Sequence, residues 1–416
     1  MITYLDNLGK RSKLAFFEKI SSSKKNKVLL DFANLIDKEK KSIISENLKD
    51  IKKSENKNLR GNLIDRLILD YNKIRQIIKS IKSIINLNDP ENQVLKKWTR
   101  PNGLIIKKVT VPIGVIGVIY ESRPNVTSDV SSLCFKSGNC VILKGGSEAY
   151  NTNKMLVYLF RKSLKKNNLN QNYVQFIDSK NRNVVDYMLA SMSQYIDIII
   201  PRGGKNLVKK VQQKSKVPII GHLEGICHTY IDKDADIDMA KKILINAKLR
   251  NTAICGATET ILFHEKISKT FIKPILKSLI DRGCEIFADK KTKKIFKENL
   301  RTATKTSWST EYLSSKVSVK IVKNSKEAID HINRYGTMHT DAIVTQNNTS
   351  AKEFLKNIKS SIAMHNTSTQ FADGGEFGFG GEVGISTNKL PPRGPVGLNE
   401  LVSYKYQVFG KGHIRK

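Results

Sequence analysis

Short apolar runs rich in β-branched residues, separated by segments of helical periodicity, fill most of the chain after position 100. Examples are NCVILKGG, YVQFID, YIDIIIPRGG, CHTYID and DAIVTQ. A run without polar alternation indicates a strand buried on both faces, as in a parallel sheet covered by helices. This pattern constrains the fold more than any other feature, and it predicts an α/β protein built from βαβ units.

The first hundred residues predict helices instead. Apolar residues recur at helical spacing on one face of Val28–Ile36 and again on one face of Ile77–Ile85. Ser21–Ser23 supply N-cap candidates before the first of these segments. Extended strands are then expected over Leu104–Tyr120. The tail after Leu401 is expected to form a late strand that leaves the domain body.

Two further apolar runs are interpreted as strands, VPIIGHLEG (217–225) and AICGATETILFH (253–264). No linker rich in Pro and Gly separates domains, so the best candidate for a boundary lies at Gly221–Gly225, before CHTYID. A chain of 416 residues is long for one core and sufficient for two domains.

Composition bounds the class of protein. No window approaches the roughly 18 consecutive apolar residues of a membrane helix, and the charged N-terminus lacks the apolar core of a signal peptide. The five cysteines are odd in number and have no CxxC spacing, which does not favour a disulfide framework. We expect a soluble cytoplasmic protein in which a thiol stays reduced and reactive.

The net charge of +34, from 72 basic and 38 acidic residues, resembles that of a nucleic-acid-binding protein. The lysines are, however, scattered along helical stretches, without base-stacking aromatic motifs or zinc-finger spacing. We therefore expect no specific nucleic-acid partner. The charge is suited to attracting anionic substrates and cofactors.

Two glycine pairs follow expected strands. Gly203 and Gly204 come after IIIPR and before a helix. Lys144 precedes the second pair, Gly145-Gly146, and Ser147 follows it. Glycines there let the backbone approach a phosphate at a helix N-terminus. A basic side chain at the end of a parallel strand suits a ribose hydroxyl or a 2′-phosphate. Tight turns also use glycine routinely, so both interpretations stay open.

Two loops are candidates for function. In ESRPNVT, Asn125 is either a turn or N-cap residue, or an amide donor aimed at developing oxyanion charge. The stretch Phe371–Ser386 is too long and too rich in glycine for a simple turn. It is either a flexible linker or a loop packed over a substrate through its phenylalanines.

The histidines do not predict a metal site. His222, Cys227 and His228 are close in sequence, but no pair of residues has HExxH or CxxC spacing. Cys227 and His228 alternate faces on an expected strand, so the two do not easily point at one ion.

Cys255 is either a small core residue or a nucleophile. Arg250-Asn251-Thr252 precede it, and Gly256 and Ala257 follow it. Small neighbours keep a sulfur accessible and let a backbone N–H approach a reacting carbonyl. The local sequence alone leaves both possibilities open.

Together these stretches resemble one family. VPIGVIGVIYESRPNVTSD, IIIPRGGKNLV, NAKLRNTAICGATETILFH and FADGGEFGFGGEVGIST, among others, are similar to the γ-glutamyl phosphate reductases (glutamate-5-semialdehyde dehydrogenases) of the aldehyde dehydrogenase superfamily. The matching stretches follow the order of the family from about residue 90 to the C-terminus. ESRPNVT and DGGEFGFGGEVGIST are specific to this reductase within the superfamily.

The resemblance implies NADPH-dependent reduction of L-glutamyl 5-phosphate through a cysteine thioester, the second step of proline biosynthesis from glutamate. Cys255 matches the nucleophile and Asn125 the oxyanion amide. The matches to cofactor-binding positions are Lys144, Ser147, Gly203, Gly204 and Glu311, and a lysine at the first is compatible with NADPH. A solvated surface acid is the alternative for Glu311.

The resemblance also implies an aldehyde dehydrogenase-like architecture. A helical N-terminus and Rossmann-like cofactor domain would span 1–225, with 385–416 returning as linker and tail, and 226–384 would carry the nucleophile. A small β-element around Gly103–Val115 and the tail would form a dimer or tetramer. Glutamate 5-kinase is a further expected partner. Substrate-binding candidates are Arg123, Gly374, Gly375 and Arg393.

Two positions depart from the family pattern. Gly256 stands where the family commonly has Asn, and Glu224 is an acid in a stretch often written without one. Hydrolytic members of the superfamily use a Glu near this point as a base for water, which a reductase must exclude.

One rival function is a reductase for another acyl phosphate or an acyl thioester. Another is an inactive basic protein that binds nucleic acid.

Overall fold

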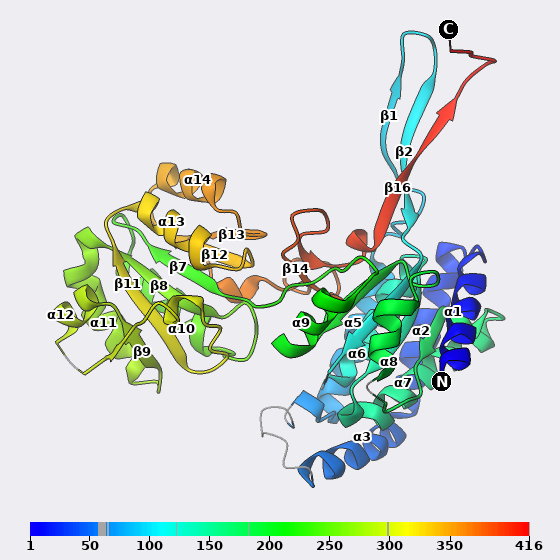
Figure 1. The fold of residues 1–416 in the computed structure, drawn as a ribbon, viewed down its shortest axis with the longest axis horizontal. Helices are drawn as coiled ribbons and strands as arrows, with labels where there is room; N and C mark the ends of the chain where they lie inside the picture. Colours follow the sequence, from blue (N-terminus) through cyan, green and yellow to red (C-terminus); the bar gives the residue numbers. More distant parts are fainter. Residues whose placement is uncertain (57–63, 65, 122, 182, 298, 416) are drawn as a thin grey trace. The chain divides into compact units, whose positions relative to one another are not determined.

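The computed structural model describes the chain except positions 57–63, 65, 122, 182, 298 and 416, and it contains two compact units (Figure 1). The first unit comprises Met1–Gly221, Gly378–Gly384 and Val396–Lys416, and the second comprises His222–Phe377 and Ile385–Pro395. The sequence-based boundary was Gly221–Gly225, with all of 385–416 returning to the first domain, whereas Ile385–Pro395 belongs to the second unit here.

The first unit is built on a four-stranded parallel sheet in the order β5-β4-β3-β6. Val118 of β3 pairs with Leu143 of β4 on one side and with Ile200 of β6 on the other. The strands are β3 (Val115–Tyr120), β4 (Cys140–Gly145), β5 (Val174–Phe176) and β6 (Ile198–Arg202).

Helices surround this sheet, and the N-terminal ones were expected from their apolar faces. Ser21 caps α2 by accepting a hydrogen bond from the Lys24 N–H, as the serine run predicted. The helices are α1 (Ile2–Phe16), α2 (Ser22–Lys38), α3 (Lys40–Glu55), α5 (Tyr71–Asn86), α6 (Pro124–Lys136), α7 (Tyr150–Lys166), α8 (Asn183–Ser191) and α9 (Lys205–Lys214).

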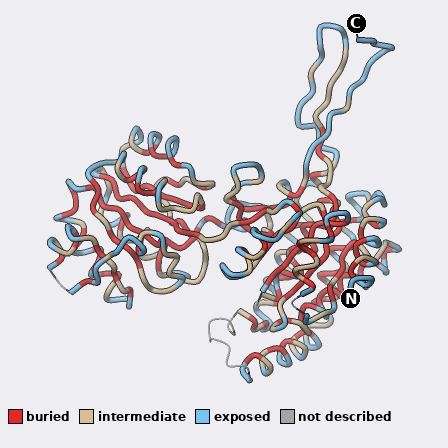
Figure 2. The backbone as a smooth tube through the Cα atoms, in the orientation of Figure 1, coloured by how far each residue is buried: buried red, intermediate tan, exposed pale blue. Residues whose placement is uncertain are grey.

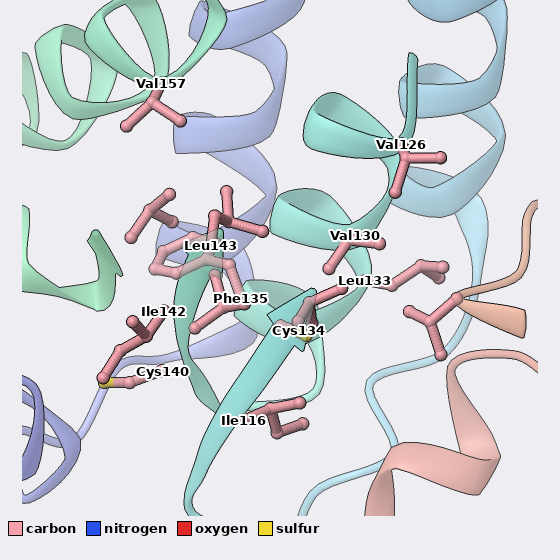
Figure 3. Packing of buried hydrophobic residues seen from close by; sticks show 14 of the residues in the cluster. Ile116, Val126, Val130, Leu133, Cys134, Phe135, Cys140, Ile142, Leu143 and Val157 are labelled. Atoms are coloured by element: carbon pink, nitrogen blue, oxygen red, sulfur yellow. The ribbon is translucent and has the colours of Figure 1, made fainter. Parts of the chain in front are cut away.

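The core of this unit lies where the helices cover the strands. Ile116 of β3, Ile142 and Leu143 of β4, and Leu133 and Phe135 of α6 belong to one buried cluster, and Figure 3 draws them together. Each of these side chains is at most 1% exposed. Because the strands are covered by helices, their apolar runs have no polar alternation.

A second, antiparallel sheet of the first unit has the order β1-β2-β16. Its strands are β1 (Val94–Thr99), β2 (Ile105–Pro112) and β16 (Val402–Phe409), and Figure 1 draws them as an extension of this unit. The expected strands over 104–120 and after 401 are therefore confirmed. Gly114, with φ of +140°, separates β2 from β3.

The second unit contains a seven-stranded parallel sheet in the order β10-β9-β11-β8-β7-β12-β13. The parallel sheet predicted from the apolar runs is thus present. Its strands are β7 (Cys227–Ile231), β8 (Thr258–His264), β9 (Glu285–Ala288), β10 (Arg301–Thr302), β11 (Lys316–Val322), β12 (Thr340–Val344) and β13 (Ile362–His365).

Both faces of this sheet are covered, and Figure 2 shows its strands as buried. Ile261 and Phe263 of β8 belong to one apolar cluster with the first helices of the unit, whereas Leu262 belongs to another with the last two. The helices are α10 (Ile237–Leu249), α11 (Ser268–Ile280), α12 (Lys290–Phe296), α13 (Ser325–Tyr335) and α14 (Asn348–Asn357). No helix in the described residues is long and apolar enough to span a membrane.

Two expected strands differ from the prediction. VPIIGHLEG contributes only one bridge, Ile219 with Ile199, and the rest of it is a loop, which fits its Pro218, Gly221 and Gly225. In AICGATETILFH the strand begins at Thr258, so Cys255 precedes β8. A two-stranded sheet of β14 (Gly384–Ser386) and β15 (Gly394–Val396) completes the described fold.

Candidate active site

The loops that enter four neighbouring strands of the second unit carry the candidate site. Cys255 lies in the loop before β8, His222 in the loop before β7, His339 directly before β12, and Glu311 in the loop before β11. These strands are adjacent and parallel in the order β11-β8-β7-β12. Because parallel strands start at the same edge of a sheet, the four loops converge at its amino edge.

Cys255 is paired there with two imidazoles. One ligating atom from each of His222, Cys255 and His339 lies within 4.8 Å of the other two. Burial raises the pKa of the Cys255 thiol, but the charges of His339 and His222 outweigh that effect and lower the pKa well below its ordinary value. A partly exposed thiol with a lowered pKa has the properties that a nucleophile needs and that a core cysteine lacks.

The two rings are held by different contacts. His222 Nδ1 lies 2.8 Å from the Ile385 carbonyl oxygen, an acceptor, so this nitrogen carries the hydrogen. His339 Nδ1 lies 2.9 Å from Thr340 Oγ1 and 3.6 Å from Cys227 Sγ. The rings meet edge to face with centroids 4.8 Å apart. Each ring therefore has one nitrogen anchored within the second unit.

Gly225 joins the nucleophile loop to Glu311. Its backbone N–H donates to Glu311 Oε1 at 2.9 Å, and its α-carbon packs against Cys255. Burial raises the pKa of Glu311, and the charge of Cys255 adds to that effect, while the Gly225 N–H opposes it. Glu311 is thus a half-buried carboxyl beside the thiol and not a solvated surface acid.

The other side of the nucleophile loop is held by η5 (Thr369–Phe371). Thr258 Oγ1 lies 3.0 Å from Thr369 Oγ1. Gln370 Oε1 accepts from Arg250 Nε at 2.8 Å, and its Nε2 donates to the Ala247 carbonyl at 2.9 Å. These bonds fix the end of α10 against η5, so the turn that carries Cys255 starts from a rigid point.

The first unit holds Asn125 and Arg123 at the start of α6. Arg123 is the N-cap residue, Pro124 follows it, and Asn125 stands in the first turn with an exposed side chain. Asn125 Nδ2 donates to Asp129 Oδ2 at 3.2 Å. Burial raises the pKa of Asp129 to about 6, although hydrogen bonds from Ser80 and Asn125 oppose the rise. Asn125 is therefore an oriented amide and not the helix cap.

The first unit also holds the expected cofactor-binding residues. Lys144 is buried near the carboxyl end of β4, and its Nζ donates to the Gly145 carbonyl at 2.8 Å. Burial lowers the pKa of Lys144, which the charge of Glu148 opposes. Ser147 is exposed and begins η1 (Ser147–Ala149) immediately after β4.

Gly203 and Gly204 form the turn between β6 and α9, and Gly204 is the N-cap residue of α9. The Gly204 N–H donates to Glu121 Oε2 at 2.8 Å. A Cβ on Gly203 would come 2.7 Å from Leu207 and would also crowd the Glu121 carboxylate. A side chain at 203 would therefore require the ends of the Leu207 and Glu121 side chains to move.

The remaining candidates lie in the second unit. The Gly375 N–H donates to Asp373 Oδ1 at 2.8 Å, whereas Gly374 is buried. Arg393 is exposed and donates from Nη2 to the Lys359 carbonyl at 2.7 Å. Glu224 is half-buried in the loop before β7. The Gly375 and Arg393 bonds do not involve Cys255.

Sequence reasoning missed His222 and His339 as partners of Cys255. Motif spacing cannot find them, because they come from loops that are far apart in the chain. The available signal covered only one of them: His339 stands shortly before the expected strand DAIVTQ, whereas His222 was assigned to the expected strand VPIIGHLEG. Cys227 and His228 do face different partners as predicted, since Cys227 contacts His339 and the His228 ring bonds Asp341 at 2.8 Å.

Comparisons with known proteins identify the family of the chain. The sequence profile described as "Aldehyde dehydrogenase family" matches residues 10–282. The gamma-glutamyl phosphate reductase of Bartonella quintana is 44% identical over 413 residues, which are 99% of this chain and 100% of that protein. The enzyme of the same name from Brucella suis biovar 1 is 45% identical over 395 residues, which are 95% of this chain and 94% of that protein.

A solved structure extends the likeness to the fold. The crystal structure of gamma-glutamyl phosphate reductase from Thermotoga maritima is 40% identical and has a TM-score of 0.95, covering 99% of this chain and 100% of that one. The aldehyde dehydrogenase-like fold predicted from the sequence is confirmed. The chain belongs to the aldehyde dehydrogenase family and, within it, to the gamma-glutamyl phosphate reductases.

Proposed function

We propose that the protein is an NADPH-dependent reductase that converts L-glutamyl 5-phosphate to L-glutamate 5-semialdehyde and phosphate, the second step of proline biosynthesis from glutamate. Membership of the reductase family supports the substrate and the overall reaction. The single observation that supports the chemistry is the Cys255 thiol between His222 and His339, with its lowered pKa. We also propose that the enzyme works in the cytoplasm.

The Cys255 thiolate attacks the acyl phosphate carbon, and its sulfur forms the new bond. The C–O bond to phosphate breaks as the tetrahedral adduct collapses, phosphate leaves with the bonding electrons, and a thioester remains on Cys255. The Asn125 amide and the Cys255 backbone N–H would stabilise the oxyanion, and losing one such donor costs about 100- to 1000-fold in rate.

The cofactor, when bound, supplies the hydride that reduces the thioester carbon. The reduced adduct then expels the Cys255 thiolate as the aldehyde forms. His222 and His339 stabilise that thiolate as a leaving group for the same electrostatic reason that they stabilise it before attack. Phosphate is a stable anion, so its departure needs no strong acid.

The aldehyde dehydrogenase family uses nicotinamide cofactors, and the first unit offers residues that fit one. Lys144 and Ser147 stand at the carboxyl end of β4, where dinucleotides bind open parallel sheets. The buried Lys144 cation, bonded to the Gly145 carbonyl, fits a 2′-phosphate and supports NADPH over NADH. Gly203 and Gly204 would flank the cofactor, and Glu311 would hold the nicotinamide ribose.

Binding of the substrate needs donors for its phosphate and its α-carboxylate. Arg123, Arg393 and the backbone of Gly374 and Gly375 are the proposed donors. The Gly375 N–H already donates to Asp373, and Arg393 Nη2 to the Lys359 carbonyl, so each would have to exchange its partner to bind the substrate.

The antiparallel sheet β1-β2-β16 supports a homo-oligomer, a dimer or a tetramer. It exposes Tyr404, Tyr406, Val408 and Phe409 on one strand, which is unusual for a surface that stays in water. The lability of an acyl phosphate supports association with the glutamate 5-kinase that would make it.

The reverse reaction tests the proposal. Oxidation of glutamate semialdehyde by NADP is expected to require phosphate and to vanish in Cys255→Ala. Turnover without phosphate would identify a hydrolytic dehydrogenase, with Glu224 or Glu311 as the base for water. Turnover supported by coenzyme A in place of phosphate would identify an acyl thioester reductase. Activity that survives in Cys255→Ala would refute the covalent mechanism.

A further inference from the structure

We propose that His222, Cys255 and His339 form a binding site for one Zn²⁺ ion, which reversibly silences the nucleophile. One sulfur and two imidazole nitrogens are a common ligand set for zinc in proteins. The three residues come from loops before β7, β8 and β12 of a single unit, so a rigid sheet edge holds them together.

The distances fit a single ion. The three ligating atoms lie within 4.8 Å of one another. With Zn–S of about 2.3 Å and Zn–N of about 2.0–2.1 Å, the ligating atoms of a tetrahedral site lie roughly 3.3–3.6 Å apart. Small side-chain rotations therefore close the set around zinc without moving the backbone.

The orientation of the rings fits as well. The His222 Nδ1–H is bound to the Ile385 carbonyl, which leaves Nε2 as the metal ligand. A backbone carbonyl behind the second ring nitrogen is the usual support of a zinc-bound histidine. His339 is fully buried, and its Nε2 has no hydrogen-bond partner among the described residues. A buried nitrogen without a partner is costly, and a metal ion would satisfy it.

The charges favour a divalent cation. The thiolate contributes one negative charge, and the half-buried Glu311 carboxyl lies near enough to interact with it electrostatically. Three protein ligands leave a fourth position for water, as in open zinc sites. Cys227 Sγ lies 3.6 Å from His339 Nδ1 and donates to the Cys255 carbonyl at 3.1 Å, so it is a neighbour and not one of the three grouped ligands.

Coordination changes the chemistry of Cys255 without a redox step. The thiolate lone pair that would attack the substrate forms the Zn–S bond instead, and any proton on a ligating ring nitrogen is released to solvent. Removal of the ion by a chelator restores the thiolate. Soft and borderline cations such as Zn²⁺ and Co²⁺ fit this site, whereas Mg²⁺, which prefers oxygen ligands, does not.

The test uses the full chain, freed of metal, and titrates it with Co²⁺ as a coloured substitute for Zn²⁺. We expect one tetrahedral Co²⁺ per chain with a thiolate-to-cobalt absorption band that Zn²⁺ bleaches and Mg²⁺ does not. Cys255→Ser should abolish the band. His222→Asn and His339→Asn should each weaken binding by about tenfold or more. His413→Asn, in the exposed tail, is the matched control and should bind as the native chain does.

Alkylation of Cys255 gives a second readout that needs neither substrate nor cofactor. Zn²⁺ should slow carboxamidomethylation of Cys255, measured on its peptide by mass spectrometry, and a chelator should restore the rate. No cobalt band in the native chain, or a band unchanged in His222→Asn, would overturn the proposal. His222→Asn decides the matter if His339→Asn fails to fold by circular dichroism. Failure of the reductase activity would leave these metal-binding results unaffected.

Discussion

Gly225 lies against Cys255 so closely that a Cβ on Gly225 would come 2.7 Å from the Cys255 Cβ and closer still to its carbonyl oxygen. Real Cβ atoms essentially never approach within 3.0 Å. The same glycine donates its N–H to Glu311 at 2.9 Å. The backbone at Gly225 therefore fixes the position of the turn that carries the Cys255 thiol and also holds the Glu311 carboxyl.

Gly225→Ala should displace the Cys255 turn. Because a misplacement of about 1 Å at a reacting group costs about 100-fold in rate, we expect kcat to fall by about that factor. Overpacking should cost about 1–3 kcal/mol of unfolding free energy. Gly221→Ala is the matched control, since its Cβ would meet Pro201 at an ordinary 3.4 Å. A native kcat in Gly225→Ala would show that the close approach has no role.

The parallel sheet of the second unit could be predicted because each strand is an apolar run such as CHTYID or DAIVTQ. Cys255 could be named as a candidate because its small neighbours are adjacent in sequence. His222 and His339 could not be assigned to it. Their approach depends on the strand order β8-β7-β12, which no local pattern encodes.

The strand predicted over 217–225 shows the same limit. Its apolar residues matched a buried strand, yet only Ile219 pairs with a neighbour, and the segment passes on as a loop. Pro218 and the flanking glycines carried the correct signal, but the apolar run outweighed it. Because 217–225 was predicted to be a strand, His222 was expected to lie within a sheet. It was therefore not considered for a loop beside Cys255.

The two imidazoles should control the reactivity of Cys255. Removing either positive charge should raise the thiol pKa, since those charges are what overcome the effect of burial. In His339→Asn and His222→Asn we expect slower alkylation by iodoacetamide at about pH 6, by about tenfold for each unit of pKa, and convergence with the native rate at alkaline pH. The rate is measured in metal-free buffer as a function of pH.

His413→Asn tests whether any histidine change has this effect, and it should follow the native profile. The interpretation fails if His222→Asn and His339→Asn titrate with the native midpoint. A uniform loss of rate at every pH would also contradict it, because such a loss signals lower access to the sulfur and not a changed pKa.

Asp129 should make stability depend on pH. Burial raises its folded pKa to about 6 from an unfolded value of 3.8. The neutral carboxyl is therefore favoured in the folded chain. Its contribution is fully present below the unfolded pKa and is lost as the pH rises through about 6. We expect Asp129→Asn to remove that part of the pH dependence in denaturant unfolding at several pH values.

The decisive quantity is how steeply the free energy of unfolding changes with pH in the native and the variant chain. Its absolute value is not decisive, because the substitution also changes the bonds to Ser80 and Asn125. Ser80 bonds Oδ1 and Asn125 bonds Oδ2, so the single oxygen of an amide keeps only one of the two bonds as it stands. Asp186→Asn is the control, since its pKa is lowered by hydrogen bonds from Lys210 and Lys214, so its effect should appear with the opposite sign at lower pH. Equal slopes in native and Asp129→Asn chains would contradict the assignment.

Lys248 and Glu259 form an ion pair at 2.5 Å in which both side chains are at most 1% exposed. Glu259→Gln should cost about 3–5 kcal/mol of unfolding free energy, because it leaves a buried ammonium group without its countercharge. Replacing both residues with Met should recover most of that loss, since two buried charges then disappear together.

Fluorescence of Trp308 in a Trp98→Phe background reports unfolding of the second unit, which contains the pair. The exposed pair of Lys291 with Glu265 in the same unit is the control, and Glu265→Gln should change stability by less than about 1 kcal/mol because solvent screens that pair. If Glu259→Gln costs no more than Glu265→Gln, the buried pair does not stabilise the fold as its geometry implies. If the double variant is as unstable as the single one, the loss comes from packing, or from the Leu313 N–H that Glu259 accepts, and not from an unpaired charge.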